Sequence, residues 1–200
     1  MKTKNLLLIA ALALSALPAK SAEDTPVVVT NPPAPAATED KPDYLYFKEG
    51  LITRKSKTTL DFDITLAAEI PANFDRDRTV TFWVKFDVDN DASTGRAAIT
   101  FPSFGKDVVC RIYKPRGTNR WQTDSGTMVL KGRKETVDLT KVKVNGNKLT
   151  FQASSQAFSG RPEMRALMSS CTSQYDDGEE TSANTTDQLP RGGAFTIKGD

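Results

Sequence analysis

The sequence contains no histidine among its 200 residues, and this absence removes several classes of chemistry. Histidine is the usual general base near neutral pH and the commonest transition-metal ligand in proteins. A Ser-His-Asp triad, a Cys-His pair and a histidine-held zinc or haem are therefore excluded. The kind of metal site that remains is one that binds a hard cation through oxygen atoms.

The sequence also lacks an apolar run long enough to cross a membrane as a helix. Its most apolar segment, residues 6–17, follows Lys2 and Lys4. A positive start followed by a short apolar stretch is typical of a secretory signal peptide. We therefore predict a signal peptide over residues 1–22, no membrane span, and an exported protein that is periplasmic or extracellular.

No strong excess of charge of either sign is present. The 27 lysine and arginine residues and 25 acidic residues give a formal net charge of +2. Removing the predicted signal peptide takes away three lysines, which leaves 24 basic against 25 acidic residues and a formal charge of −1. Nucleic-acid-binding proteins usually carry a strong basic stripe, so we expect no nucleic-acid partner.

Residues 23–43 are rich in proline, alanine, threonine and valine, with three prolines among residues 32–35. Such a composition lacks the large apolar side chains that build a core and favours extended conformations. We therefore predict a disordered tether over residues 23–43. Residues 44–200 then form one domain of about 157 residues, long enough for a sizeable core.

Only two cysteines are present, Cys110 and Cys171. In an exported chain, two cysteines predict a single disulfide bond. In the chain-entropy model, closing a loop of this length stabilises the fold by roughly 4 kcal/mol. The alternative is two buried free thiols.

From residue 44 onward the chain is a succession of short runs in which apolar and polar residues alternate, as in strands with one buried face. Asn145-Gly146 between two such runs indicates a tight hairpin, and no segment sustains a 3.6-residue period. We predict an all-β fold, an antiparallel and jelly-roll-like β-sandwich of about eight to nine strands. The predicted strands are residues 44–47, 60–66, 79–87, 107–114, 127–131, 136–144, 148–153, 164–170 and 194–198.

Three carboxylates alternate where one predicted strand ends, at Asp87, Asp89 and Asp91. Acids this close repel each other unless a cation or backbone N–H groups hold them. Calcium takes about six to eight oxygen ligands, so the loop is a candidate calcium site. An EF-hand is excluded because Ala92 and Ala98 stand where that motif needs glycine and glutamate. The alternative is a turn capped by its own Asp and Asn side chains.

The two tryptophans, Trp83 and Trp121, are candidate ligand-binding residues. Trp83 lies on the more polar face of the predicted strand 79–87, where a flat aromatic ring can stack on a sugar ring. Trp121 lies close to a predicted turn. For each tryptophan the alternative is packing against another part of the chain.

Four further segments of the domain are informative: residues 86–95 with Asp-x-Asp-Asn-Asp-x-x-Thr-Gly, residues 105–107 with Gly-Lys-Asp, residues 142–151, and residues 187–193. Together they resemble the DOMON-like and family 9 carbohydrate-binding-module type of extracytoplasmic β-sandwich. In such modules an Asp-rich loop can bind calcium, and an open face or edge can bind sugar. By this resemblance Asp107 would complete a metal site with Asp87, Asp89 and Asp91.

The sequence offers no recognisable catalytic set. It has no Gly-rich phosphate loop and no nucleophile elbow, and the acids on predicted strands, such as Asp61 and Asp63, are interpreted as solubilising. We therefore predict that the chain is not an enzyme but an exported binding module for a glycan, with a structural calcium ion. The alternative is a structural or protein-interaction domain of the cell envelope, whose partner is an envelope protein.

Overall fold

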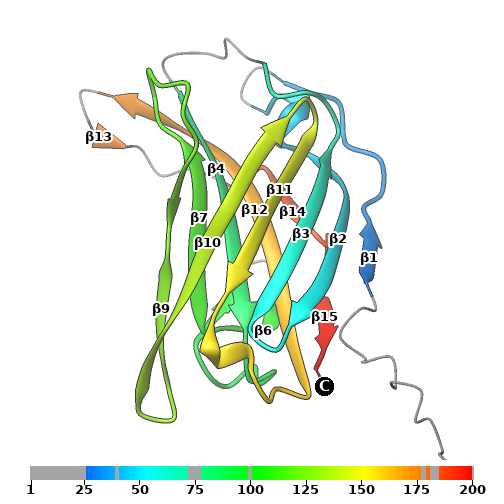
Figure 1. Cartoon of the computed structure of the whole chain (residues 1–200). Coiled ribbons are helices and arrows are strands. Elements are labelled where there is room, and N and C mark those ends of the chain that lie inside the picture. The colour runs from blue at the N-terminus through cyan, green and yellow to red at the C-terminus, as the bar shows by residue number, and fades with distance from the viewer. Residues whose placement is uncertain are drawn as a thin grey trace, which may run out of the picture.

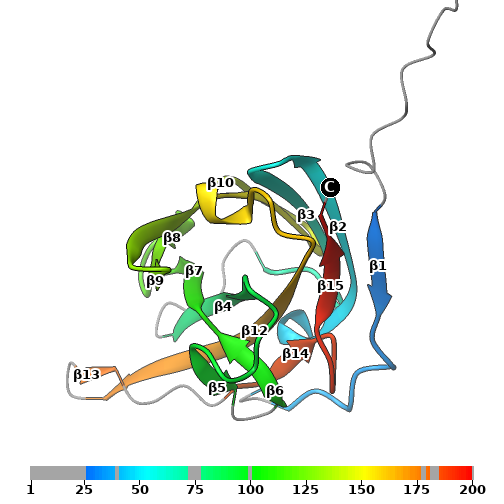
Figure 2. The ribbon, with the colours of Figure 1, turned by 90° about the horizontal axis from the view of Figure 1, so that it is seen from below.

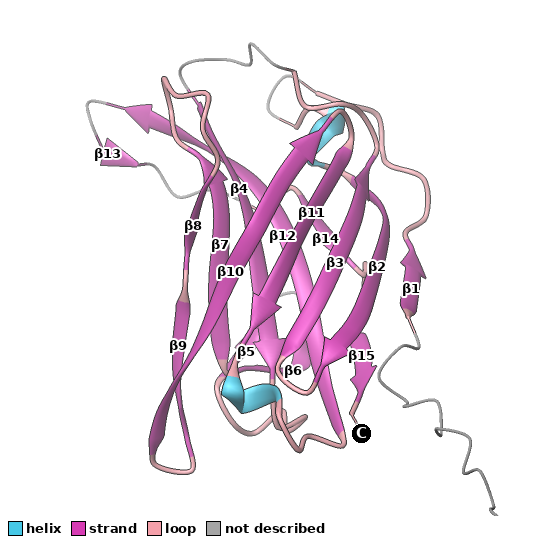
Figure 3. Ribbon diagram, in the orientation of Figure 1, coloured by secondary structure: helices cyan, strands magenta, loops and turns pink. Residues whose placement is uncertain are grey.

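The computed structural model describes residues 26–38, 41–71, 78–98, 101–176, 179–180 and 185–199. Within these ranges the chain forms strands β1 to β15 and two short 3-10 helices, arranged as an antiparallel β-sandwich (Figures 1 and 3). The predicted all-β class is confirmed, with more strands than the eight or nine expected. None of the helices described is long and apolar enough to span a membrane. The predicted signal peptide, residues 1–22, lies outside the described residues.

The first sheet has six strands in the order β1-β2-β3-β11-β10-β9. All neighbours in this sheet run antiparallel. The predicted hairpin is confirmed, because Asn145 pairs with Lys148 across a turn in which Gly146 has a φ of 58°. The strands are β1 (Val27–Thr30), β2 (Phe47–Ser56), β3 (Thr59–Leu66), β11 (Lys148–Ser154), β10 (Arg133–Asn145) and β9 (Gly126–Leu130).

The second sheet has seven strands. Its long strand β12 pairs with β4, and it also pairs with the short strands β13, β14 and β15 along different parts of its length. A separate hairpin, β5 and β6, follows the acidic loop. The elements are β13 (Glu179–Glu180), β12 (Glu163–Asp176), β4 (Arg78–Asp87), β7 (Val108–Lys114), β8 (Gln122–Asp124), β14 (Asp187–Leu189), β15 (Phe195–Lys198), β5 (Arg96–Ala98), β6 (Phe101–Lys106), η2 (Asp43–Leu45) and η3 (Gln156–Phe158).

The two sides of the sandwich differ. On one side β8 pairs with β7 of the second sheet, and after Ser125 the chain continues as β9, which pairs with β10 of the first sheet. This passage joins the two sheets. On the other side β15 lies next to β1 and β2 without pairing with either (Figure 2).

The core lies between the sheets and is built from the inward faces of the alternating strands. Phe62 of β3 stacks on Phe151 of β11 with ring centroids 4.4 Å apart, and Phe86 of β4 meets Phe62 edge-on at 6.1 Å. All three side chains are at most 2% exposed. Burying an aromatic side chain of this size stabilises a fold by about 1.5–3 kcal/mol, so this cluster contributes strongly to holding the two sheets together.

The start of the domain differs from the prediction in two places. Part of the predicted disordered tether, residues 23–43, belongs to the sandwich: β1 pairs with β2, and Val27 and Val29 pack against the core. A run of β-branched residues suits an edge strand and outweighs the prolines that follow it. The predicted opening strand 44–47 is instead helix η2 and the first residue of β2.

The predicted disulfide is wrong, because Cys110 and Cys171, which are both buried, are not bonded to each other. Cys110 lies on β7 opposite Val84, and Cys171 lies on β12 opposite Thr81, so β4 separates them. Strands two positions apart are about 9–10 Å apart, which exceeds the roughly 7 Å between Cα atoms that a disulfide can span. Val84 and Thr81 also point to opposite faces of β4, so the two thiols do as well.

Candidate metal site and polar binding face

An acidic cluster lies where β4 ends. Oxygen atoms of Asp87, Asp89 and Asp107 all lie within 4.8 Å of one another. Asp87 is fully buried, whereas Asp89 and Asp107 are half-buried. Asp107 precedes β7, and its backbone N–H donates to the Phe86 carbonyl at 2.9 Å, which holds it beside the end of β4.

Asp91, which the sequence predicts as a ligand, lies outside this cluster. Its Oδ1 accepts hydrogen bonds from the backbone N–H of Ser93 at 2.8 Å and from the Ser93 hydroxyl at 2.6 Å. These bonds lower the pKa of Asp91. The side chain therefore stabilises the turn from its exposed side and does not join the other three carboxylates.

Protein groups already hold part of the negative charge of the cluster. Arg165 of β12 forms an ion pair with Asp87. The hydroxyl of Thr94 donates to Asp89 at 2.9 Å and lies 3.3 Å from Asp107 Oδ1. The N–H of Val88 donates to Asp107 at 2.8 Å. The loop therefore has features of both structures predicted for it. Its own side chains cap the turn, and its oxygen atoms form a group of the kind that a hard cation binds.

The surroundings of Asp107 disfavour its charged form. Burial raises the pKa of Asp107, and the charges of Asp89 and Asp87 raise it further, against the lowering effect of the hydrogen bond from Val88. A bound divalent cation would relieve both the repulsion and the desolvation penalty. Thr94, whose hydroxyl reaches two of the carboxylates, was not identified as a candidate ligand from the sequence.

Gly105 of β6 lies against the acidic loop at a position that leaves no room for a Cβ atom. A Cβ atom at this position would lie 2.4 Å from the carbonyl oxygen of Asp91 and 2.5 Å from that of Thr94. The backbone N–H of Gly105 also donates to Asp87 at 3.3 Å. The acidic loop therefore rests directly on the backbone of β6.

Replacing Gly105 by alanine is expected to displace the loop and to destabilise the fold by about 1–3 kcal/mol, the usual cost of overpacking. Urea unfolding measures this loss. Gly193→Ala is the matched control, because the nearest atom to a Cβ there is 3.9 Å away. Equal stability of the two variants would contradict the close packing of loop and strand.

The two tryptophans do not form a common platform. Trp121 packs against the core, with its ring stacked on Phe82 at 5.9 Å. Trp83 lies half-buried on the outer face of the second sheet, where the guanidinium of Arg111 lies 5.6 Å from its ring centroid. Trp121 is therefore a packing residue. Trp83 shares its outer face with Tyr113, whose ring centroid lies 3.9 Å from the same guanidinium.

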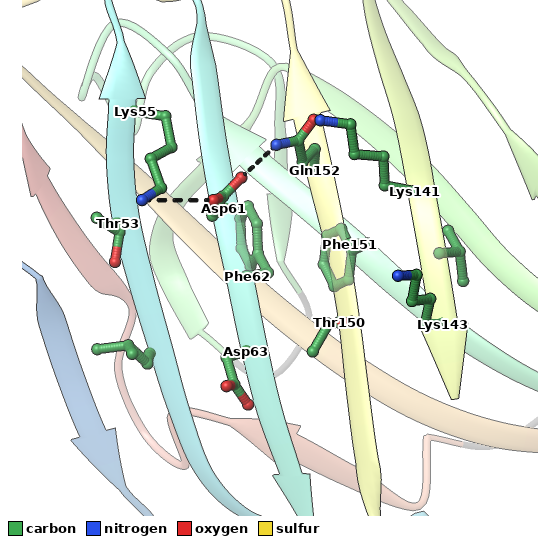
Figure 4. A pocket seen from close by; sticks show the side chains of 12 residues that line it. Thr53, Lys55, Asp61, Phe62, Asp63, Lys141, Lys143, Thr150, Phe151 and Gln152 are labelled. Atoms are coloured by element: carbon green, nitrogen blue, oxygen red, sulfur yellow. Dashed lines mark hydrogen bonds and ion pairs between the residues drawn. The ribbon is translucent and has the colours of Figure 1, made fainter. Parts of the chain in front are cut away.

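A groove of about 510 Å³ lies on the outer face of the first sheet (Figure 4). Polar side chains from β2, β3, β11 and β10 line it, and we call this surface the polar face. At its centre Gln152 donates to Asp61 at 2.8 Å, and Lys55 lies 3.9 Å from the other oxygen of Asp61. The polar residues that line it are Thr53, Lys55, Asp61, Asp63, Lys141, Lys143, Thr150 and Gln152.

A β-bulge in β10 determines which residues of that strand reach the polar face. The register with β11 shifts between Thr140 and Lys143, and Lys141 has a φ of 53°. Before the bulge Leu139 faces the core, whereas beyond it Val142 packs inward. Lys141 and Lys143 consequently both line the groove.

The outer face of the second sheet carries a half-buried lysine. Lys85 of β4 donates to the hydroxyl of Ser169 at 2.8 Å. Burial lowers the pKa of Lys85 to about 8, with a further contribution from Lys106. The hairpin β5–β6 covers the neighbouring part of this face, where Phe104 packs on Leu167.

Lys85 is expected to make stability depend on pH. Between about pH 8 and 10.5 the unfolded chain binds more protons at this residue than the folded chain, so its contribution to stability rises with pH. Below pH 8 the lysine is charged in both states and its burial penalty is fully present. The free energy of unfolding of wild type, measured relative to Lys85→Met, should therefore rise across this window. Lys55→Met, at an exposed lysine, should give a flat difference, and equal slopes for both variants would contradict the assignment.

The chain matches no protein-family model, and no curated protein or solved structure is significantly similar to it. The resemblance to DOMON-like and family 9 carbohydrate-binding modules therefore stays a prediction. What the structure itself provides is an antiparallel β-sandwich with an acidic cluster at one strand end and a polar groove on one outer face.

Proposed function

We propose that the chain is an exported, non-catalytic binding module that holds a glycan on the polar face of the first sheet. The observation that carries this proposal is the groove in which Lys55, Asp61 and Gln152 form one connected row across three strands. Sugar hydroxyls both donate and accept hydrogen bonds, and such a row presents charged and amide groups that can pair with them.

The charges of the groove favour a glycan that carries acidic groups. Three lysines, Lys55, Lys141 and Lys143, line it together with two aspartates, Asp61 and Asp63. The surface is therefore positive overall, although the whole mature chain is nearly neutral. Two of the strands that carry these residues, β3 and β11, lie at the centre of the sheet, which gives the site a rigid base.

Glycan-array binding followed by affinity electrophoresis tests this proposal. The double variant Asp61→Ala/Gln152→Ala should lose binding. The matched double variant Gln122→Ala/Asp124→Ala, with the same residue types exposed on β8 of the other sheet, should retain it. Trp83→Ala separates the polar face from the aromatic surface of the second sheet. Absence of binding to any glycan with calcium supplied, or equal loss in both double variants, would refute the proposal.

We further propose a structural calcium ion at Asp87, Asp89 and Asp107, with Thr94 beside it. The donor set fits, because hard cations take carboxylate and hydroxyl oxygens. The ion would supply positive charge that ties the loop to the start of β7. It would take no part in a reaction.

Calcium is expected to raise the thermal midpoint of the apo protein. At a calcium concentration of a hundred times the dissociation constant, the gain is about 2.7 kcal/mol, or roughly 5–10 °C for a domain of this size. Melting with calcium and with a chelator measures it. Asp89→Asn should reduce the response, whereas Asp124→Asn on β8 should leave it unchanged. A midpoint that is the same with calcium and with chelator would contradict the site.

The alternative is a protein-interaction domain, and one observation favours it. Strand β1 forms one edge of the first sheet, and Val28 on it is 58% exposed. An exposed edge with an apolar residue can pair with a strand of another chain. A single dominant protein captured from envelope extract, with no competition by sugars, would support this alternative over glycan binding.

A further inference from the structure

Arg54 of β2 is a buried cation whose charge is not neutralised by a carboxylate among the described residues. Only 4% of the residue is exposed. Its Nε donates to the Lys198 carbonyl at 3.2 Å, and its Nη1 reaches the carbonyls of Lys57 at 3.1 Å and Phe158 at 3.5 Å. The partner of Nη2 is the sulfur of Met164 at 4.0 Å, which is a weak acceptor.

A buried guanidinium in this state is energetically costly. Carbonyl dipoles compensate a positive charge only in part, and an uncompensated buried charge costs several kcal/mol. Natural proteins usually pair such a group with an anion. The arrangement of Arg54 therefore needs an explanation beyond the three hydrogen bonds that it makes to the backbone.

A cavity of about 400 Å³ lies beside Arg54. Its lining comes from β1, β2 and β15, and Figure 2 shows β15 next to these two strands, with which it does not pair. Its walls include the apolar side chains of Val27, Ile52 and Ile197, and its lining also contains Arg54, Thr196, Lys198 and Gly199. Val27 and Ile52 are opposite one another in the register of β1 and β2. We call this space the β15 cavity.

We propose that the β15 cavity binds a small carboxylate with an apolar body, whose carboxyl group pairs with Arg54. The volume lies within the range of small-molecule sites, and apolar walls with a few polar or charged groups are typical of them. Arg54 is the buried cation of the lining, whereas Lys198 is exposed to solvent. We therefore expect a monoanion, because a second negative charge inside the cavity would be left without a buried partner. The site is separate from the polar face and the acidic cluster, and it does not depend on the glycan proposal.

Isothermal titration calorimetry of the full mature chain with octanoate, below its micelle concentration, tests the proposal, with octanol as the neutral counterpart. Octanoate should bind and octanol should bind at least about tenfold more weakly, the factor expected for one charge-assisted hydrogen bond. Arg54→Met should weaken octanoate binding by about the same factor and leave octanol binding unchanged. Failure of a straight-chain series from butanoate to decanoate to bind would overturn the proposal.

A second pair of variants keeps the test decisive if Arg54→Met does not fold. Val27→Trp fills the cavity from β1 while leaving Arg54 unsubstituted, and it should abolish octanoate binding. Val28→Trp places the same side chain on the opposite, 58% exposed face of the same strand, and it should bind octanoate as wild type does. Binding that survives in Val27→Trp, or that is equal for octanoate and octanol, would also overturn the proposal.

Discussion

Replacing Arg165 by methionine is expected to destabilise the fold by about 3–5 kcal/mol, because it leaves the buried Asp87 carboxylate without its cation. Asp87 is fully buried, and the side chain of Arg165 is 17% exposed. Methionine keeps most of the apolar stem that packs beside Phe104, where the guanidinium lies 5.6 Å from the ring centroid. The loss therefore reports mainly on the charge. Chemical unfolding with a chelator present measures it.

The control for this prediction is Arg111→Met. Arg111 forms an ion pair of the same residue types with Asp124 at 2.6 Å, but both side chains reach solvent, with exposed fractions of 24% and 48%. Such pairs contribute about 0–1 kcal/mol. If Arg165→Met were no more destabilising than Arg111→Met, Asp87 would have to be stabilised without Arg165.

Replacing Asp187 by alanine is expected to cost about 3 kcal/mol, because several segments lose one shared acceptor. The carboxylate of Asp187 accepts from the backbone N–H of Phe47 at 2.7 Å and from Arg191 at 2.7 and 3.0 Å. Arg191 in turn donates to the carbonyls of Pro32 and Pro33. The variant should unfold at lower denaturant, and the segment after β1 should exchange its amide hydrogens faster.

The control for Asp187 is Asp124→Ala, which removes an aspartate–arginine pair at the surface. Its expected loss is below about 1 kcal/mol. Hydrogen exchange adds an independent measurement, since Asp187 orients the Arg191 side chain that donates to the carbonyls of Pro32 and Pro33. Unchanged exchange in residues 31–38 of Asp187→Ala would show that this segment is held by other contacts.

Most strands could be predicted from the sequence because apolar and polar residues alternate along them, which shows which side chains are buried. In β3, Leu60, Phe62 and Ile64 alternate with polar residues, and all three are buried. Strand β1 was missed because its three valines stand next to prolines, and local composition outweighed them. Strand β14 was missed because all three of its residues are buried, which leaves no alternation to recognise.

The acidic cluster was predicted in part, and the polar face was not. Asp87 and Asp89 lie two residues apart on one loop, so their proximity follows from the chain itself. The polar face combines residues from four strands, and Lys141 and Lys143 reach it beyond a bulge that no spacing revealed. Asp61 and Asp63, interpreted as solubilising, line the groove because β11 and β2 lie on either side of β3.

The sequence by itself determined the all-β class, the positions of most strands and the crowding of acids at the end of one of them, because alternation and turn residues act over a few neighbouring positions. Only the tertiary structure decided which strands are neighbours. That order keeps Cys110 and Cys171 apart, separates Trp83 from Trp121, and places Arg54 beside a cavity. The physical reason is that strand order depends on how the two apolar faces pack together, which is a property of the whole chain.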